Sequence, residues 1–294
     1  MRRESTGLAA VPTPAGDSSA IDWGTVPLPD AWPDRLRLRH PADLLVFLGR
    51  LFGRRRRVEV PESLPGADSL PEYLRQEFHH LPNGNYSKRI VKGYSHGFDL
   101  LMLGRARKAR AAIARQLASC RAVLDVGCGS GGLAGQLVAA GVPDVWGLDA
   151  SPYLLREAAR RYPQVRLVQG LAERNPFPSR RFDGVGACFL FHELPTPEGD
   201  AALAELHRVL APHGTLAIVE PSPLQFRPRD LWRFLRHARF AGLYFSLLAW
   251  GIYEPFAAAW HRRDVGDWLD RHGFDLREDA IGMPLRTIVA TRRR

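Results

Sequence analysis

The feature that most constrains the fold is an apolar run at residues 122–126 that leads directly into the glycine-rich turn 127–132. Glycine adopts backbone conformations that let a chain turn sharply and approach a ligand closely. The next residues, 132–140, are predicted to form a helix, and the first N–H groups of a helix are free and carry positive partial charge. A strand, a glycine turn and a helix in this order predict a ligand site where the strand ends.

Short β-rich runs alternate with helical patterns over the rest of the chain. Strands are predicted at residues 122–126, 145–149, 165–169, 183–189 and 214–220, and helices at 132–140, 152–161 and 199–210. Such alternation indicates βαβ units and a parallel sheet with helices on both faces. A helix at 264–272 and two runs at 274–279 and 285–291 would close the sheet with an antiparallel edge hairpin.

Three further regions are predicted around this core. Residues 1–33 carry five prolines among small polar residues and are predicted to be disordered or loosely ordered. Residues 34–104 are predicted to form a helical N-terminal extension, or lid. Residues 105–294 form the main domain, with a substrate-side helical insertion at 223–262. Arg229, Arg233, Arg236 and Arg239 form a basic stripe in that insertion, and residues 240–253 after it carry no formal charge.

Charge and cysteine content narrow the function classes. The net charge of +10 comes from local arginine runs such as 54–57 and 292–294, which permit an anionic partner without choosing between nucleic acid, acidic lipid and substrate. The three cysteines lie far apart, so neither a disulfide framework nor a zinc site is predicted. The adjacent His79 and His80 are interpreted as surface histidines, and no metal site is predicted.

The chain shows no secretory signal and no apolar stretch of membrane-spanning length. A cytoplasmic protein is expected, and peripheral contact with a membrane surface stays open. The uncharged run at 240–253 is too short to span a bilayer. It fits a buried lid helix or an amphipathic segment that receives an apolar substrate.

The glycines alone do not identify the ligand, because Gly127, Gly129 and Gly132 also fit a dinucleotide-binding pattern. Asp149 ends the next predicted strand, where a carboxylate suits a ribose diol in either case. Asp125 distinguishes between the possible ligands, because a carboxylate beside this turn would repel a pyrophosphate and attract an ammonium group. This residue disfavours a nicotinamide-dependent oxidoreductase.

Four ordered segments resemble class I S-adenosylmethionine (SAM)-dependent methyltransferases. They are residues 123–131 (VLDVGCGSG), 147–151 (GLDAS), 182–194 (FDGVGACFLFHEL) and 203–220 (LAELHRVLAPHGTLAIVE). The resemblance covers roughly residues 105–222 and is closest to the broad small-molecule and quinone-type group. It implies an α/β, Rossmann-like, doubly wound sheet, with SAM as cofactor and S-adenosyl-L-homocysteine (SAH) as product.

The resemblance also implies which residues hold the cofactor. Asp125 and the glycine turn would hold the methionine end, Asp149 the ribose, and Ala150 the adenine. Leu171 departs from the aspartate common at its position, which leaves apolar contact through Ala172. The cofactor residues expected in full are Asp125, Gly127, Cys128, Gly129, Gly131, Asp149, Ala150, Leu171, Ala172, Cys188 and Tyr94.

Candidate acceptor residues follow the fourth predicted strand or lie in the flanking regions. His192 is a candidate general base, because its ordinary pKa lies near neutrality. The residues predicted to contact the acceptor are His192, Glu193, Tyr86, Tyr244 and Trp250. A cap or packing role is the alternative for His192.

The resulting hypothesis is direct methyl transfer from SAM to a bulky apolar or aromatic small molecule, lipid-like or quinone-like. An RNA or DNA methyltransferase is one alternative, motivated by the arginine runs. It is disfavoured because residues 188–191 (CFLF) replace the Asn-Pro-Pro-Tyr-type motif of many such enzymes. A non-catalytic SAM- or lipid-binding protein is another. The sequence does not choose the methylated atom or the oligomeric state.

Overall fold

The computed structural model of the protein describes residues 21–51, 56–226, 240–252 and 254–294. Three features of the sequence lie outside these ranges. They are residues 1–20, Arg54 and Arg55 of the first arginine run, and the basic stripe at 229–239.

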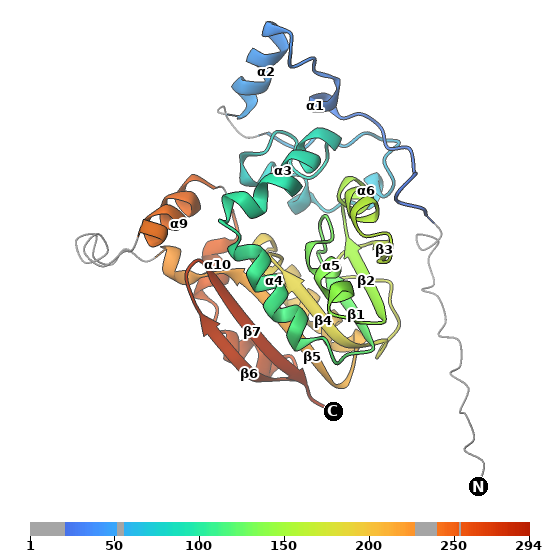
Figure 1. Ribbon diagram of the computed structural model, residues 1–294, viewed down its shortest axis with the longest axis vertical. Coiled ribbons are helices and arrows are strands. Elements are labelled where there is room, and N and C mark those ends of the chain that lie inside the picture. Colours follow the sequence, from blue (N-terminus) through green and yellow to red (C-terminus); the bar gives the residue numbers. More distant parts are fainter. Residues whose placement is uncertain (1–20, 52–55, 227–239, 253) are drawn as a thin grey trace.

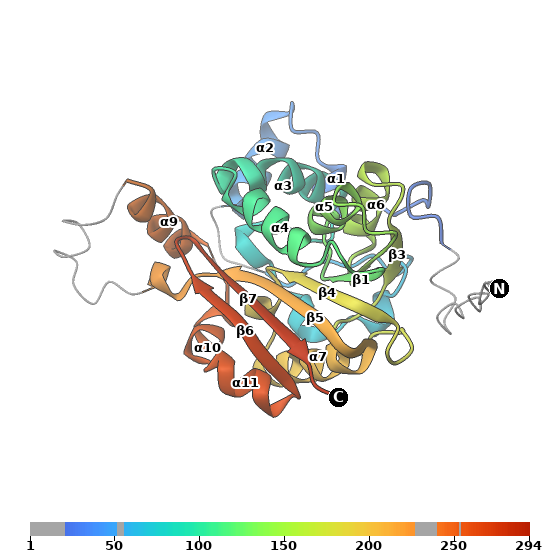
Figure 2. The ribbon, with the colours of Figure 1, turned by 60° about the horizontal axis from the view of Figure 1, so that its bottom comes forward.

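A seven-stranded sheet in the order β3-β2-β1-β4-β5-β7-β6 forms the centre of the molecule (Figure 2). Its strands are β1 (Ala122–Val126), β2 (Asp144–Asp149), β3 (Arg166–Gln169), β4 (Phe182–Cys188), β5 (Leu210–Pro221), β6 (Phe274–Ile281) and β7 (Leu285–Arg292). The first five are parallel, whereas β7 is antiparallel to both β5 and β6. The predicted doubly wound sheet with an antiparallel edge hairpin is confirmed.

Helices cover both faces of this sheet, because its central strands are apolar on both sides. One face packs against α4 (Arg105–Gln116), α5 (Gly132–Ala139) and α6 (Pro152–Arg161). The other packs against α7 (Thr196–Val209), α10 (Ala257–Arg262) and α11 (Val265–Arg271). Trp260 of α10 and Trp268 of α11 are both buried there, so the end of the predicted insertion belongs to the main core.

The N-terminal region lies over the carboxyl ends of β1 and β2 (Figure 1). It contains α1 (Trp32–Arg35), α2 (Pro41–Leu51) and α3 (Lys88–Leu101). Between α2 and α3 the described chain forms short 3-10 turns, η2 (Ala67–Ser69), η3 (Glu72–Leu74) and η4 (Phe78–His80), and one isolated β-bridge between Arg57 and Gln76. The extension is therefore less helical than expected, since prolines and glycines interrupt this stretch.

Residues 21–33 differ from the predicted loose N-terminus. Trp23 is only 2% exposed and packs in the core cluster beneath α4, α5 and α6. Its Nε1–H donates a hydrogen bond to the carbonyl of Leu167 at 3.2 Å. One buried indole with such a hydrogen bond is enough to fix the irregular backbone of these residues on the domain.

The insertion contributes α9 (Phe240–Gly251), beside the end of α3 (Figure 1). The Tyr244 hydroxyl donates a hydrogen bond to the carbonyl of Leu101 at 2.7 Å. Within the described ranges, no helix has both the length and the apolar character needed to cross a membrane.

Candidate active site

A cavity of about 260 Å³ lies at the carboxyl ends of β1, β2 and β4, beneath the N-terminal region. Ten of the residues predicted to hold the cofactor line it: Tyr94, Asp125, Gly127, Cys128, Gly129, Asp149, Ala150, Leu171, Ala172 and Cys188. They meet because the carboxyl ends of parallel strands share one edge of the sheet.

The glycine turn places backbone directly against this cavity. Gly127 and Gly129 have φ of +64° and +53°, in the left-handed region that favours glycine. A Cβ on Gly127 would lie 2.9 Å from Leu190 Cδ1. Gly131 does not line the cavity, unlike the prediction: its added Cβ would meet the Tyr162 ring of the α6 end at 2.8 Å. Its role is to let α5 pack closely.

Asp125 is a buried carboxylate with one unused oxygen. It is 1% exposed, and Oδ2 accepts a hydrogen bond from Ala134 N at 2.9 Å. Oδ1 has no hydrogen-bond partner among the described residues. Burial raises the pKa of Asp125 to about 7, although the Ala134 hydrogen bond and the charge of Arg110 lower it in part. An oxygen of this kind is poised to receive a cationic or hydrogen-bonding ligand.

Arg110 of α4 lines the same cavity and was missed by the sequence analysis. It forms an ion pair with Asp99 of α3, yet its buried Nε has no partner in the part of the chain that the structure describes. The cavity thus presents a guanidinium and a carboxylate together. Arg110 could not be singled out because it is one of several arginines in an Ala/Arg-rich helix.

Asp149 is held rigidly at the end of β2. Its Oδ2 accepts a hydrogen bond from Gly129 N and its Oδ1 from Ser151 N, both at 2.8 Å. Burial raises the pKa of Asp149 to about 6, while these backbone hydrogen bonds lower it in part. Each oxygen keeps a lone pair for a ligand hydroxyl.

A second cavity of about 140 Å³ adjoins the first. The two share five wall residues: His79, Tyr94, Phe98, Phe189 and Glu193. The remaining walls are mostly apolar and come from α9, the end of α3 and the β5 and β7 ends: Leu101, Met102, Pro221, Phe245, Leu248, Ala249, Ile252 and Leu285. The first cavity, whose wall includes the charged groups Asp125, Asp149 and Arg110, is therefore continuous with a mainly apolar second one.

The predicted acceptor residues are divided between these cavities. His192 lines the second cavity, Glu193 lines both, and Tyr86 lines only the first. Tyr244 lines neither cavity. The orientation of α9 turns Phe245 toward the second cavity, while the Tyr244 hydroxyl donates a hydrogen bond to the Leu101 carbonyl of α3. The side chain of Trp250 lies outside the described part of the structure.

His192 is fixed by Glu220 at the end of β5. Its Nδ1 lies 2.5 Å from Glu220 Oε2, and both side chains are buried. Glu220 Oε1 also accepts hydrogen bonds from the backbone N–H groups of Leu190 and Phe191. With Nδ1 occupied, His192 presents Nε2 toward Glu254, 3.6 Å away. Burial alone would lower the pKa of His192, but Glu254 and Glu220 raise it well above its ordinary value.

His79 is not the surface histidine that the sequence suggested. It has a φ of 56°, and its ring stacks on Tyr94 with 5.7 Å between centroids. Its Nε2 lies 3.3 Å from Glu193 Oε1 and 3.6 Å from Glu254 Oε1. Glu254 was also missed, although one signal existed: it is the first charged residue after the uncharged run 240–253.

Comparison with known proteins identifies the class. A family model described as a methyltransferase domain matches residues 123–214. A demethylmenaquinone methyltransferase of Beutenbergia cavernae is 30% identical over 188 residues, which make up 63% of this chain and 75% of that protein. A methyltransferase of Synechocystis sp. is 36% identical over 52% of this chain, and a demethylmenaquinone methyltransferase of Chlorobaculum tepidum is 37% identical over 34%.

The chain spans 66% and 40% of the length of these last two relatives. Human N-acetylserotonin methyltransferase, solved in complex with SAM, matches 71% of this chain and 57% of its own, with a TM-score of 0.51. At 16% identity that match shows the fold alone. The sheet order, the cavity at its carboxyl edge and these relatives show that the chain belongs to the SAM-dependent methyltransferase family.

Proposed function

We propose that this protein transfers a methyl group from SAM to a bulky apolar or aromatic acceptor of quinone-like shape. The observation that carries the proposal is the pair of adjoining cavities with a common wall. A donor in the first cavity and an acceptor in the second would meet at Tyr94, Phe189 and Glu193. Placing two reactants in contact supplies much of the acceleration of a displacement reaction.

The first cavity fits SAM by the charges of its buried groups. The methionine end of SAM carries an ammonium and a carboxylate. The cavity offers Asp125 Oδ1 and Arg110 Nε, which have no hydrogen-bond partner among the described residues. Asp149, fixed by Gly129 and Ser151, would bind the ribose hydroxyls. When bound, SAM supplies an activated methyl group. The fold therefore needs only to bind, orient and exclude water.

The second cavity fits an acceptor with an apolar body and a polar edge. Phe245 and Leu248 of α9 would contact the body, while Glu193 and His192 lie at the polar end. His192 Nε2 faces that end, 3.6 Å from Glu254 Oε1. Its raised pKa favours the protonated ring, so a general-base role for His192 stays a prediction. Two relatives named as demethylmenaquinone methyltransferases support a quinone-like acceptor.

The direct test combines a binding and a transfer experiment. We expect purified protein to bind SAH in isothermal titration calorimetry and to move the methyl group of isotope-labelled SAM onto a reduced demethylated naphthoquinone, detected by mass spectrometry. Glu193→Gln, in the wall that the two cavities share, should reduce methyl transfer. Glu278→Gln, at an exposed position on β6, is the matched control and should leave transfer unchanged. Transfer to RNA or DNA instead, or SAH binding without transfer to any hydroxylated aromatic compound, would contradict the acceptor proposal.

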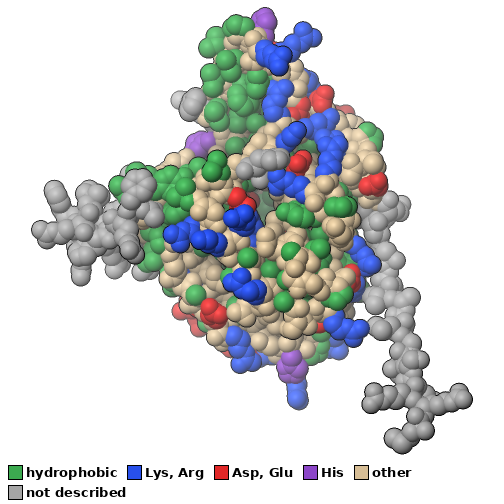
Figure 3. Space-filling model, in the orientation of Figure 1, with side chains coloured by type: hydrophobic (Ala, Val, Ile, Leu, Met, Phe, Trp, Pro, Cys, Tyr) green, Lys and Arg blue, Asp and Glu red, His purple; other side chains and the backbone are tan. Residues whose placement is uncertain are grey.

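Peripheral contact with a membrane is part of the same proposal, because a quinone-like acceptor partitions into lipid. Helix α2 has no buried residue, and hydrophobic side chains gather on it at the top of the molecule (Figure 3). Leu45 and Val46 are 70% and 53% exposed. The exposed Arg37 and Arg39 precede it, which suits an anionic bilayer surface. We expect co-sedimentation with phosphatidylglycerol vesicles that Leu45→Glu abolishes. Equal sedimentation of both proteins would argue against α2 as the contact.

A further inference from the structure

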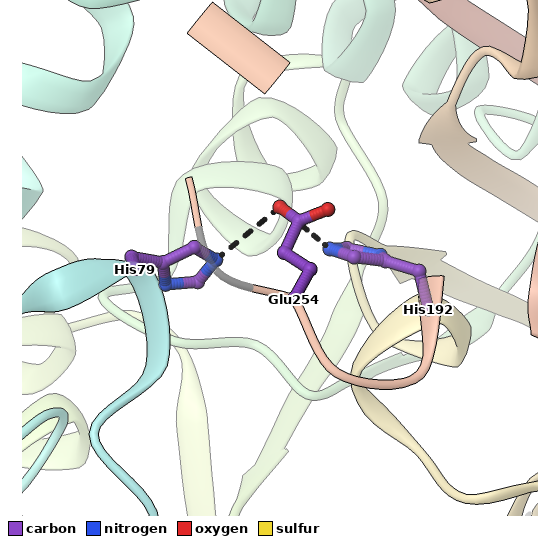
Figure 4. Close-up of side chains that lie close together, drawn as sticks. All are labelled: His79, His192 and Glu254. Carbon is purple, nitrogen blue, oxygen red and sulfur yellow. Dashed lines mark ion pairs between the residues drawn. The ribbon is translucent and has the colours of Figure 1, made fainter. Parts of the chain in front are cut away.

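Three side chains from distant parts of the chain converge at the polar end of the second cavity. His79 comes from the turn η4, His192 from the 3-10 turn η5 (Phe191–Glu193) after β4, and Glu254 from the segment after α9. Figure 4 shows the three pointing toward one another. One nitrogen of each histidine and one oxygen of Glu254 all lie within 4.8 Å of each other, and the side chains are only 12%, 2% and 14% exposed.

The separations suit ligands around an ion better than a hydrogen-bonded chain. Glu254 Oε1 lies 3.6 Å from His79 Nε2 and 3.6 Å from His192 Nε2. A separation of 3.6 Å is too long for a hydrogen bond. Two ligand atoms that each bind one ion at about 2.1 Å in tetrahedral geometry are about 3.4 Å apart. The three atoms therefore surround a space in which a metal ion would fit with small side-chain movements.

A second layer of contacts orients these groups as in metal sites. His192 Nδ1 is bound to Glu220, which is itself fully buried and held by two backbone N–H groups. A histidine ligand commonly has its other ring nitrogen fixed by a carboxylate in this way. The His79 ring is held by stacking on Tyr94. Glu193 Oε1, 3.3 Å from His79 Nε2, is a further ligand within reach.

The charge of the cluster is compatible with a bound cation. Three carboxylates, Glu193, Glu220 and Glu254, lie around two imidazole rings, and all five side chains are mostly buried. Uncompensated buried carboxylates are costly. Either protons on the imidazole rings or a divalent ion would supply the compensating positive charge.

We propose that His79, His192 and Glu254 form a binding site for a divalent first-row transition metal ion, with Glu193 as an additional ligand. Two imidazole nitrogens and a carboxylate favour zinc, iron, cobalt or manganese over magnesium and calcium, which prefer oxygen ligands alone. All three residues line the second cavity, so the ion would face the acceptor. If the proposed function is right, the ion would bind an acceptor oxygen and lower its pKa directly, in place of a general base.

The test measures metal binding without SAM or acceptor, so that it can fail independently of the proposed methyl transfer. The protein is stripped with a chelator and titrated with Co²⁺, whose coordination by histidine gives visible absorption, and with Zn²⁺ by calorimetry. We expect one equivalent to bind. His79→Ala and Glu254→Gln should weaken binding by more than about 100-fold, and Glu220→Gln by about 10- to 100-fold.

Two controls make the outcome decisive. His40→Ala removes an exposed histidine outside the cluster and should leave metal affinity unchanged. SAH binding, measured in parallel, reports that each variant is folded. Failure of the stripped wild-type protein to bind either ion while it still binds SAH would overturn the proposal. Equal affinity in wild type, His79→Ala and Glu254→Gln would do the same, because the ion would then sit elsewhere.

Discussion

Replacing Asp125 by asparagine should make the cofactor-free protein more stable at pH 8 and weaken cofactor binding at the same time. Asp125 is buried, Oδ1 lacks a partner among the described residues, and burial raises its pKa from 3.8 to about 7. A raised carboxyl pKa means that the folded state holds a proton which the unfolded state has already released. Folding is therefore penalised as the pH rises from the unfolded pKa to the folded one.

The size of the penalty follows from the two pKa values. A change from 3.8 to about 7 corresponds to roughly 4 kcal/mol of folding free energy, fully lost above pH 7. Asparagine does not titrate, but its amide N–H group would be buried without a partner at a cost of about 1–3 kcal/mol. The variant should therefore be about 1–3 kcal/mol more stable than wild type at pH 8 and within about 1 kcal/mol of wild type at pH 5.

Urea denaturation at both pH values measures this difference, and titration with SAH measures the functional cost. Loss of a charge-assisted hydrogen bond of about 1.5–3 kcal/mol should weaken SAH binding by about 10- to 100-fold. Asp68→Asn, at an exposed position, is the matched control. The reasoning is refuted if Asp125→Asn is less stable than wild type at pH 8, or if it binds SAH with unchanged affinity.

Three further outcomes are expected. Wild-type affinity for SAH should rise between pH 5.5 and 8 as Asp149 and Asp125 ionise, with pKa values of about 6 and 7; calorimetry that finds a flat profile would show that neither carboxylate faces the ligand's ammonium or ribose. Leu248→Trp should fill the second cavity and raise the acceptor KM at least about tenfold while SAH binding stays constant; a parallel loss of SAH binding would mean a collapsed fold. Trp23→Ala should cost about 3–5 kcal/mol in urea denaturation, and a loss under 1 kcal/mol would return residues 21–33 to the predicted loose segment.

The core fold and the cofactor cavity follow from local patterns. The five parallel strands each contain a short apolar run, and most residues expected at the ligand lie at or near the carboxyl end of one of them, as Asp149 and Cys188 do. Tyr94, on α3, is an exception. Neighbours in sequence are therefore neighbours in the site. Gly131 was assigned to the ligand because it belongs to the same turn, but one step along that turn rotates it from the cavity to α6.

The acceptor side could not be predicted in the same way, because its residues meet only through tertiary packing. His79, His192 and Glu254 belong to three segments that share no motif, and the pair His79–His80 gave no hint that a left-handed backbone turns one ring inward. The aromatic composition of α9 predicted a helix near the acceptor, but it did not indicate which residues of that helix face the cavity. Phe245 rather than Tyr244 faces the cavity, because α9 packs against the end of α3.

Because the two cavities share a wall, only some substitutions should change donor binding and acceptor binding independently of each other. Asp125 lines the first cavity alone and Leu248 the second alone, so substitutions there should change donor and acceptor binding independently. Tyr94, Phe98 and Phe189 line both. Their rings pack on one another, with centroids 5.2 Å apart in each successive pair, so a change in one should shift the others. Substitution in this wall should therefore alter the affinities for donor and acceptor together, because the same rings set the distance between the methyl group and its acceptor.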